Sequence, residues 1–192
     1  MKFETIATDM GFLEGPVALS DGRIAVTSID RGKVYAMERD GSALTELATT
    51  EGGANGATEG VGGVIFVAQN GGKPPAKRGG KVQTAGVQDI APDGSIRWVT
   101  QDPVSPNDLC VGPDGMLWIT DPTRPRPKAD GRLWRCDPSS NEAELLCSVP
   151  WYPNGIGFGL QDDAVYVAST DEQRIVRFPI GPSGLGKPET FK

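Results

Sequence analysis

The segment Pro106-Asn107-Asp108-Leu109 has three counterparts in this chain, and together they decide the fold. Each carries an oxygen-bearing side chain at the same place, and the counterparts are Leu13-Glu14-Gly15-Pro16, Ala54-Asn55-Gly56-Ala57 and Pro153-Asn154-Gly155-Ile156. The successive spacings between Glu14, Asn55, Asn107 and Asn154 are 41, 52 and 47 residues. A repeat of this length is typical of a β-propeller or a solenoid.

The rest of each repeat has the pattern of a β-sheet. In the third copy, the turn Gly112-Pro113-Asp114-Gly115 is followed by the apolar run Met116-Leu117-Trp118-Ile119. Glycine supplies the positive φ of such a turn, and aspartate accepts a local backbone hydrogen bond. Third strands are expected in three of the four repeats, over 33–37, 132–136 and 174–178, and fourth strands over 43–48 and 143–149. The sequence therefore predicts an all-β protein built from blades.

Composition agrees with a packed β domain and excludes several functions. The 192 residues include 26 Gly and 16 Pro, and 38% are hydrophobic. The net charge of −6 argues against a nucleic-acid partner, which requires a basic face. No stretch approaches the roughly 18 apolar residues that a membrane span needs, so no membrane partner is expected.

The chain has no histidine, and this restricts its chemistry. Ser-His-Asp triads and histidine-bound zinc are excluded. The three cysteines, Cys110, Cys136 and Cys147, have no zinc-site spacing. We expect them to be buried reduced thiols. The N-terminus also lacks a secretory apolar region, so we expect a cytoplasmic protein.

The repeated residues would meet if the repeats surround one axis. In a propeller blade the innermost strand begins at the face where the loop from the preceding blade arrives, so Glu14, Asn55, Asn107 and Asn154 would share that face. One carboxylate and three amides on a single point are hard oxygen ligands, which suggests a calcium-type site. Each Asn-Gly or Asn-Asp pair is by itself also a turn signature.

These segments closely resemble the gluconolactonase / regucalcin / diisopropylfluorophosphatase family. The resemblance is carried by residues 12–16, 53–57, 69–72, 105–109, 114–115, 118–122 and 152–156, in the right order and at blade spacing. It covers essentially the whole chain. Members of that family are six-bladed β-propellers that bind a divalent cation on the central axis and hydrolyse lactones or phosphotriesters.

The resemblance implies a role for each repeated residue. Glu14 would be a metal-binding carboxylate and Asn154 a metal-binding amide. Asn107 would bind the metal or position the substrate, and Asn55 is a candidate substrate-binding residue. The family's remaining aspartate would fall about 50 residues after Asn154, beyond Lys192, so the catalytic residue stays unknown. Residues 1–192 are thus expected to form one propeller domain of about four blades, lacking the fifth and sixth.

The function implied is a metal-dependent hydrolase that opens a small lactone such as a sugar lactone. Its cofactor would be Ca²⁺, or another divalent cation such as Zn²⁺ or Mg²⁺. The general base is left open among Asp108, Asp121 and Asp171. Two alternative hypotheses remain open. One is a non-catalytic propeller that binds calcium or a small ligand, and the other is an inactive truncated fragment of the enzyme. Open blade edges would favour self-association.

Two long basic connections are expected on the same face as the repeated residues. They lie within 70–81 and 121–130 and carry Lys73, Lys77, Arg78, Lys81, Arg124, Arg126 and Lys128. Long loops on a rigid scaffold often carry binding residues, and a cationic rim would attract anionic substrates. Solvated loops without a binding role are the plainer interpretation.

Overall fold

The described residues form four antiparallel sheets that follow one another along the chain. The structure is a computed structural model that describes residues 3–72, 77–78, 81–82, 84–123, 130–182 and 184–191. The first sheet contains β1 (Leu13–Ala18), β2 (Ile24–Ser28), β3 (Lys33–Met37) and β4 (Thr45–Thr49). The second contains β5 (Ala54–Glu59), β6 (Ile65–Gln69), β9 (Gly86–Ile90) and β10 (Ile96–Thr100).

The third and fourth sheets repeat this plan. The third contains β11 (Leu109–Val111), β12 (Leu117–Asp121), β13 (Gly131–Cys136) and β14 (Ala143–Val149). The fourth contains β15 (Pro153–Phe158), β16 (Ala164–Ser169), β17 (Arg174–Gly181), β18 (Gly184–Leu185) and β19 (Glu189–Thr190). A separate pair, β7 (Lys77–Arg78) and β8 (Lys81–Val82), lies between β6 and β9. The fourth strands predicted at 43–48 and 143–149 correspond to β4 and β14.

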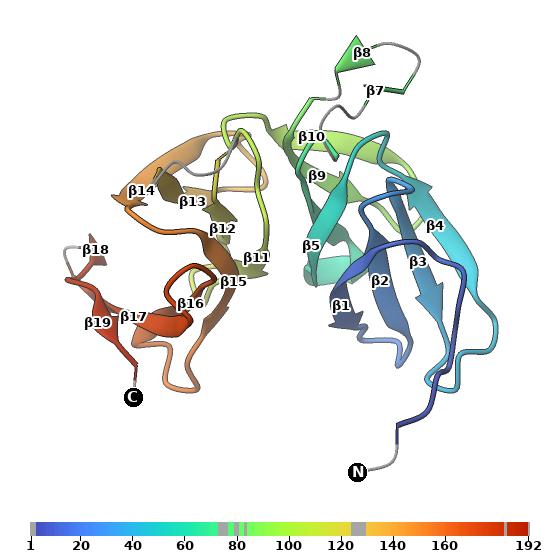
Figure 1. Cartoon of the computed structure of the whole chain (residues 1–192), viewed down its shortest axis with the longest axis horizontal. Helices are drawn as coiled ribbons and strands as arrows, with labels where there is room; N and C mark the ends of the chain where they lie inside the picture. Colours follow the sequence, from blue (N-terminus) through green and yellow to red (C-terminus); the bar gives the residue numbers. More distant parts are fainter. Residues whose placement is uncertain are drawn as a thin grey trace.

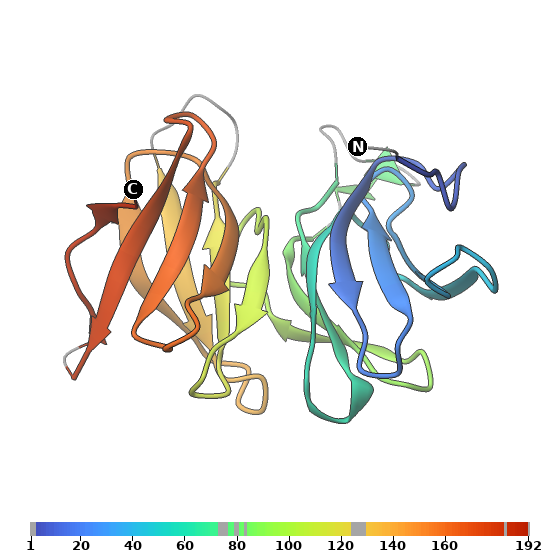
Figure 2. The ribbon, with the colours of Figure 1, turned by 90° about the horizontal axis from the view of Figure 1, so that it is seen from below.

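The sheets are arranged as the blades of a β-propeller. Figure 1 shows them in chain order around an arc, from β1–β4 to β15–β19. The first strand of each sheet lies innermost, because β5 contacts both β1 and β11, and β11 contacts β15. Figure 2, turned by 90°, shows neighbouring strands of a blade pointing in opposite directions, as in an antiparallel sheet. The predicted propeller architecture is confirmed, with four blades in the described residues.

The core lies between consecutive blades. Leu19, Ala25 and Val34 of the first blade pack against Val67 and Ile90 of the second. An equivalent cluster joins the second blade to the third and includes Phe66, Val87, Leu117, Ile119 and Cys136. Another joins the third blade to the fourth and includes Trp118, Leu133, Val165, Val176 and Phe178. Burial of this apolar area stabilises the arc at roughly 25 cal/mol per Å².

The Asp-Gly pairs form the expected hairpin turns. Asp21 and Asp114 accept backbone hydrogen bonds from the residues two positions later, Arg23 at 3.0 Å and Met116 at 3.1 Å. Gly22 and Gly115 have φ of 95° and 77°, which favours glycine. In the first and third blades these turns lie at the end opposite to the start of the inner strand.

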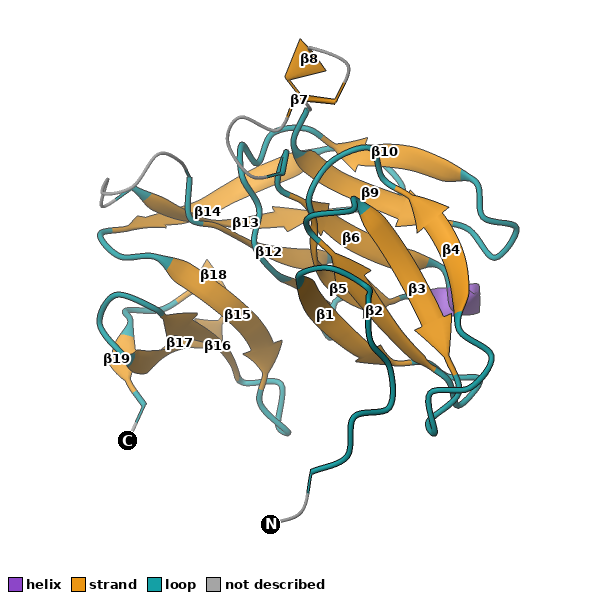
Figure 3. Cartoon of the chain, turned by 45° about the vertical axis from the view of Figure 1, so that its right-hand side comes forward, coloured by secondary structure: helices purple, strands orange, loops and turns teal. Residues whose placement is uncertain are grey.

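The second blade contains a third strand that the sequence pattern did not reveal. This strand, β9, pairs with both β6 and β10. Helical structure in the described part of the chain is limited to the 3₁₀ turn η1 (Val61–Gly63), drawn in purple in Figure 3. No helix in that part is long and apolar enough to cross a membrane.

Candidate functional site

The structure brings Glu14, Asn55, Asn107 and Asn154 together at the inner strands. They line one cavity of about 280 Å³ with Asp108 and several small or apolar residues. Asn55 is 4% exposed, Glu14 is exposed to solvent, and the other three polar residues are half-buried. Each of the four blades therefore contributes a polar side chain to the same cavity.

Irregular pairing in the inner strands shapes this cavity. The register between β1 and β2 shifts between Glu14 and Val17. The same shift occurs in β5 between Ala54 and Ala57, around Asn55, and in β15 between Pro153 and Ile156, around Asn154. A β-bulge bends the strand and changes the direction of its side chains, and it is frequent beside functional sites.

Glycines allow the inner strands to approach one another closely. Gly15 has φ of 47°, and a Cβ there would lie 2.5 Å from the backbone oxygen of Asn55. A Cβ on Gly56 would lie 2.5 Å from Asp108 Cα. The backbone amide of Gly56 donates to the Asn107 oxygen at 2.7 Å, which joins the second blade to the third beside the cavity.

Neighbouring hydroxyl groups orient two of the amides. Asn107 Nδ2 donates to Tyr152 Oη at 3.4 Å, and Asn154 Nδ2 donates to Thr170 Oγ1 at 3.1 Å. Because the amide nitrogen is engaged in each case, the amide oxygen is the atom left to act as an acceptor. An acceptor oxygen is the group that a cation or a substrate hydroxyl would use.

Asp108 is a second carboxylate in the cavity, and the sequence named it only as one of three candidate bases. Its Oδ2 accepts a hydrogen bond from the Ile156 backbone amide at 3.0 Å. Burial raises the pKa of the Asp108 carboxyl; the Ile156 and Leu109 backbone amides oppose this shift, and the nearby charge of Glu14 adds to it. Its position next to Asn107 in the sequence could have placed Asp108 at the cavity. Neighbours along a strand normally point to opposite faces, however, so this position did not predict that both side chains line the cavity.

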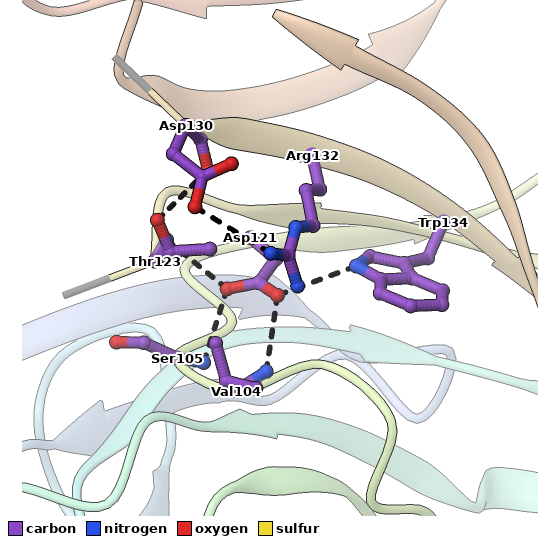
Figure 4. Close-up of polar contacts among 7 residues, drawn as sticks. All are labelled: Val104, Ser105, Asp121, Thr123, Asp130, Arg132 and Trp134. Atoms are coloured by element: carbon purple, nitrogen blue, oxygen red, sulfur yellow. Dashed lines mark hydrogen bonds and ion pairs between the residues drawn. The ribbon is translucent and has the colours of Figure 1, made fainter. Parts of the chain in front are cut away.

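Asp121 is a structural anchor and not a candidate base. The residue is fully buried, and its carboxylate accepts from the amides of Val104 and Ser105, both at 3.0 Å. It also accepts from the Thr123 amide at 3.2 Å and from Trp134 Nε1 at 3.3 Å. Figure 4 shows these donors around the carboxylate, which holds the segment leading into Asn107.

Asp171 has a comparable anchoring contact in the fourth blade. The residue is exposed, and its Oδ2 accepts from the Tyr152 amide at 3.2 Å. Neither Asp121 nor Asp171 lines the cavity. Of the three aspartates considered from the sequence, only Asp108 does.

The donor set fits a hard divalent cation. Two carboxylates and up to three amide oxygens face the cavity, and Ca²⁺ accepts such mixed oxygen ligands. The described residues contain no group of three or more His, Cys, Asp or Glu side chains placed to hold a metal. Zinc sites are usually built from nitrogen and sulfur ligands, so this set suits Ca²⁺ or Mg²⁺ better than Zn²⁺.

The basic side chains predicted for the rim lie outside the described residues. This applies to the side chains of Lys73, Lys77, Arg78 and Lys81 in one connection, and to Arg124, Arg126 and Lys128 in the other.

Comparison with known proteins identifies a family. Residues 12–192 match the model of the SMP-30/gluconolactonase/LRE-like region. No curated protein matches the chain.

Among solved structures, a gluconolactonase from Xanthomonas campestris matches with a TM-score of 0.80 and 19% identity, over 97% of this chain and 64% of that one. A calcium-binding protein, regucalcin, from Agrobacterium tumefaciens matches with a TM-score of 0.75 and 17% identity, over 96% and 60%. A chain from a nidogen/laminin complex matches with a TM-score of 0.75 and 18% identity, over 96% of this chain and 66% of that one. At these identities the similarity establishes the fold alone. The chain spans about two thirds of the length of these structures.

Proposed function

The chain belongs to the SMP-30/gluconolactonase/LRE-like family, and on that basis we propose that it is a metal-dependent hydrolase of a small lactone, such as a sugar lactone. The observation that supports this most is the cavity at the inner strands. Glu14, Asn107, Asp108 and Asn154 line it from three blades, and Asn55 lines it from a fourth. A lactone is a compact ester, and the cavity of about 280 Å³ is of a size to admit one.

In this proposal Glu14 and the oxygen of Asn154 hold the cation, with Asn107 within the same cavity. Calcium is the preferred ion, and when bound it would supply Lewis-acid stabilisation of the charge that develops on the lactone carbonyl oxygen. Asn55 and Asn107 would orient the substrate, because amides can both donate to and accept from its hydroxyl groups. Tyr152 and Thr170 keep the amides of Asn107 and Asn154 oriented through the contacts described above.

The carboxylates that line the cavity are those of Glu14 and Asp108. An attacking water held there would transfer its proton to one of these two or to a group outside the described residues. Glu14 is assigned to the cation in this proposal, which leaves Asp108 as the second carboxylate that lines the cavity and a candidate for the base.

A second function to weigh is a propeller that binds a cation or small ligand without turnover. It is favoured by the fact that a chain from a nidogen/laminin complex shares this fold about as closely as regucalcin does. A fold hosts many functions, so only the site can decide. This alternative predicts cation binding with no hydrolysis of any lactone.

The cytoplasm is the compartment we propose. Cys110, Cys136 and Cys147 are all free thiols, as expected where disulfides do not form.

The experiment is a lactone panel with chelation and metal restoration. The substrates tested are glucono-δ-lactone, a five-membered sugar lactone and an aliphatic lactone. Their hydrolysis is measured with the untreated wild-type protein, after EDTA treatment, and after Ca²⁺ is added back. We expect EDTA to abolish activity, Ca²⁺ to restore it, and Glu14→Gln to lower kcat/KM by about 100-fold. Glu38→Gln is the matched control, since Glu38 is exposed at the opposite end of its blade. Hydrolysis that survives chelation would contradict the metal mechanism.

A further inference from the structure

The Asp108 carboxylate joins two blades at the cavity. It belongs to the segment that leads into β11, whereas its hydrogen-bond donor, the Ile156 amide, belongs to β15. Ile156 ends the irregular stretch 153–156 of β15, which we call the Asn154 bulge. The bond at 3.0 Å therefore fixes the C-terminal side of this bulge from the neighbouring blade.

The other side of the Asn154 bulge is also held from the third blade. Thr120 is fully buried, and its hydroxyl donates to the Asn154 backbone oxygen at 2.7 Å. The same hydroxyl accepts from the Asp108 amide at 3.0 Å. Asp108 and Thr120 thus form one connected network that contacts the bulge at both ends, and buried networks of this kind restrict local conformation.

The carboxylate also packs against the bulge itself. A Cβ built on Gly155 would lie 3.6 Å from Asp108 Oδ2, which is ordinary van der Waals contact. The position of Asn154 in the cavity therefore depends on a side chain that belongs to another blade. Glu14, across the cavity, is the second carboxylate facing the same space.

We propose that Asp108 is a positioning residue of the central site: its carboxylate holds the Asn154 bulge in place and adds a second negative charge beside Glu14. The inference rests on the proposed function, because it assigns the second charge to the attraction of a divalent cation. Two carboxylates facing one cavity repel each other, and a divalent cation between them relieves that repulsion.

Three variants separate the two roles. Asp108→Asn retains an oxygen that can accept from the Ile156 amide but removes the charge. Asp108→Ala removes both. Asp114→Asn is the matched control, because Asp114 is in the same blade and also accepts a backbone amide, at 3.1 Å, but lies at the opposite hairpin turn.

The first readout uses the metal-free protein. Amide hydrogen exchange of Ile156 and the side-chain NH₂ signals of Asn154 are followed by NMR. We expect Asp108→Ala to accelerate Ile156 exchange at least about 10-fold and to shift the Asn154 signals. Asp108→Asn should restore both toward wild type, which a general loss of stability would not do.

The second readout is Ca²⁺ affinity by calorimetry. We expect Asp108→Asn to weaken it about 10-fold, Asp108→Ala about 100-fold, and Asp114→Asn not at all. Unchanged Ile156 and Asn154 signals in Asp108→Ala would overturn the positioning role, and equal Ca²⁺ affinity in Asp108→Asn would overturn the charge role. A wild-type protein that binds neither Ca²⁺ nor Mg²⁺ would overturn the proposed function and the charge role, while the NMR result still decides the positioning role.

Discussion

At the scale of single residues, burial lowers the reactivity of the three cysteine thiols by raising their pKa. Burial raises the pKa of Cys110 to about 12 and that of Cys136 to about 11; it raises the pKa of Cys147 as well. For Cys110 and Cys136, nearby aspartate charges add to the shift, Asp108 in the first case and Asp137 in the second. Because the thiolate is the reactive form, a raised pKa makes a cysteine unreactive.

We therefore predict that the folded protein resists thiol reagents near neutral pH. With Ellman's reagent at about pH 8, all three cysteines should react at least about 100-fold more slowly than a free cysteine. Unfolding in guanidinium should make all three react at the ordinary rate. Cys136 is buried as expected from the sequence, whereas Cys110 and Cys147 are half-buried. Rapid reaction of one thiol in the native protein would contradict the raised pKa of that cysteine.

Three aspartates that the sequence did not distinguish have different surroundings in the structure. Asp108, Asp121 and Asp171 looked alike as aspartates near one face of a propeller. Asp121 differs from the other two because its carboxylate accepts hydrogen bonds from four N–H donors. These donors belong to residues 104, 105, 123 and 134. Their convergence depends on the tertiary fold, which composition and spacing do not encode.

At the scale of the elements, strands and turns could be predicted wherever local signals were strong. Apolar runs separated by acidic turns correctly predicted the first three strands of the first, third and fourth blades. Strand β9 was missed because it follows a long glycine- and lysine-rich stretch and contains the polar residues Gln88 and Asp89. Those two side chains are buried, at 6% and 5% exposed, because neighbouring strands cover them.

The inner strands also depend on glycine at particular positions. We predict that Gly56→Ala destabilises the protein by about 1–3 kcal/mol, because the new Cβ would lie 2.5 Å from Asp108 Cα. Gly157→Ala is the matched control: Gly157 is also in an inner strand, but a Cβ there meets nothing within 4 Å. Urea denaturation measures both variants.

The control should lie within about 0.5 kcal/mol of the wild-type protein, since substitutions at open positions have small effects. Equal stability of the two variants would show that β5 does not approach the Asp108 segment as closely as described.

At the scale of the whole molecule, the cavity is a product of blade assembly. No single blade supplies more than two of its five polar residues, and consecutive blades are held together by three separate apolar clusters. A ligand that binds the assembled arc and not the unfolded chain must stabilise it. Cation binding and the stability of the molecule are therefore expected to be coupled.

The central claim is that the inner strands of separate blades form one divalent-cation site with Glu14 as a ligand. Calorimetric titration of Ca²⁺ into the wild-type protein, Glu14→Gln and Glu38→Gln tests it most directly. We predict one Ca²⁺ bound per chain by the wild-type protein and by Glu38→Gln, with a Kd weaker than about 10⁻⁵ M, because few carboxylates are present. Glu14→Gln should lose this binding, and equal binding by Glu14→Gln and the wild-type protein would contradict the claim.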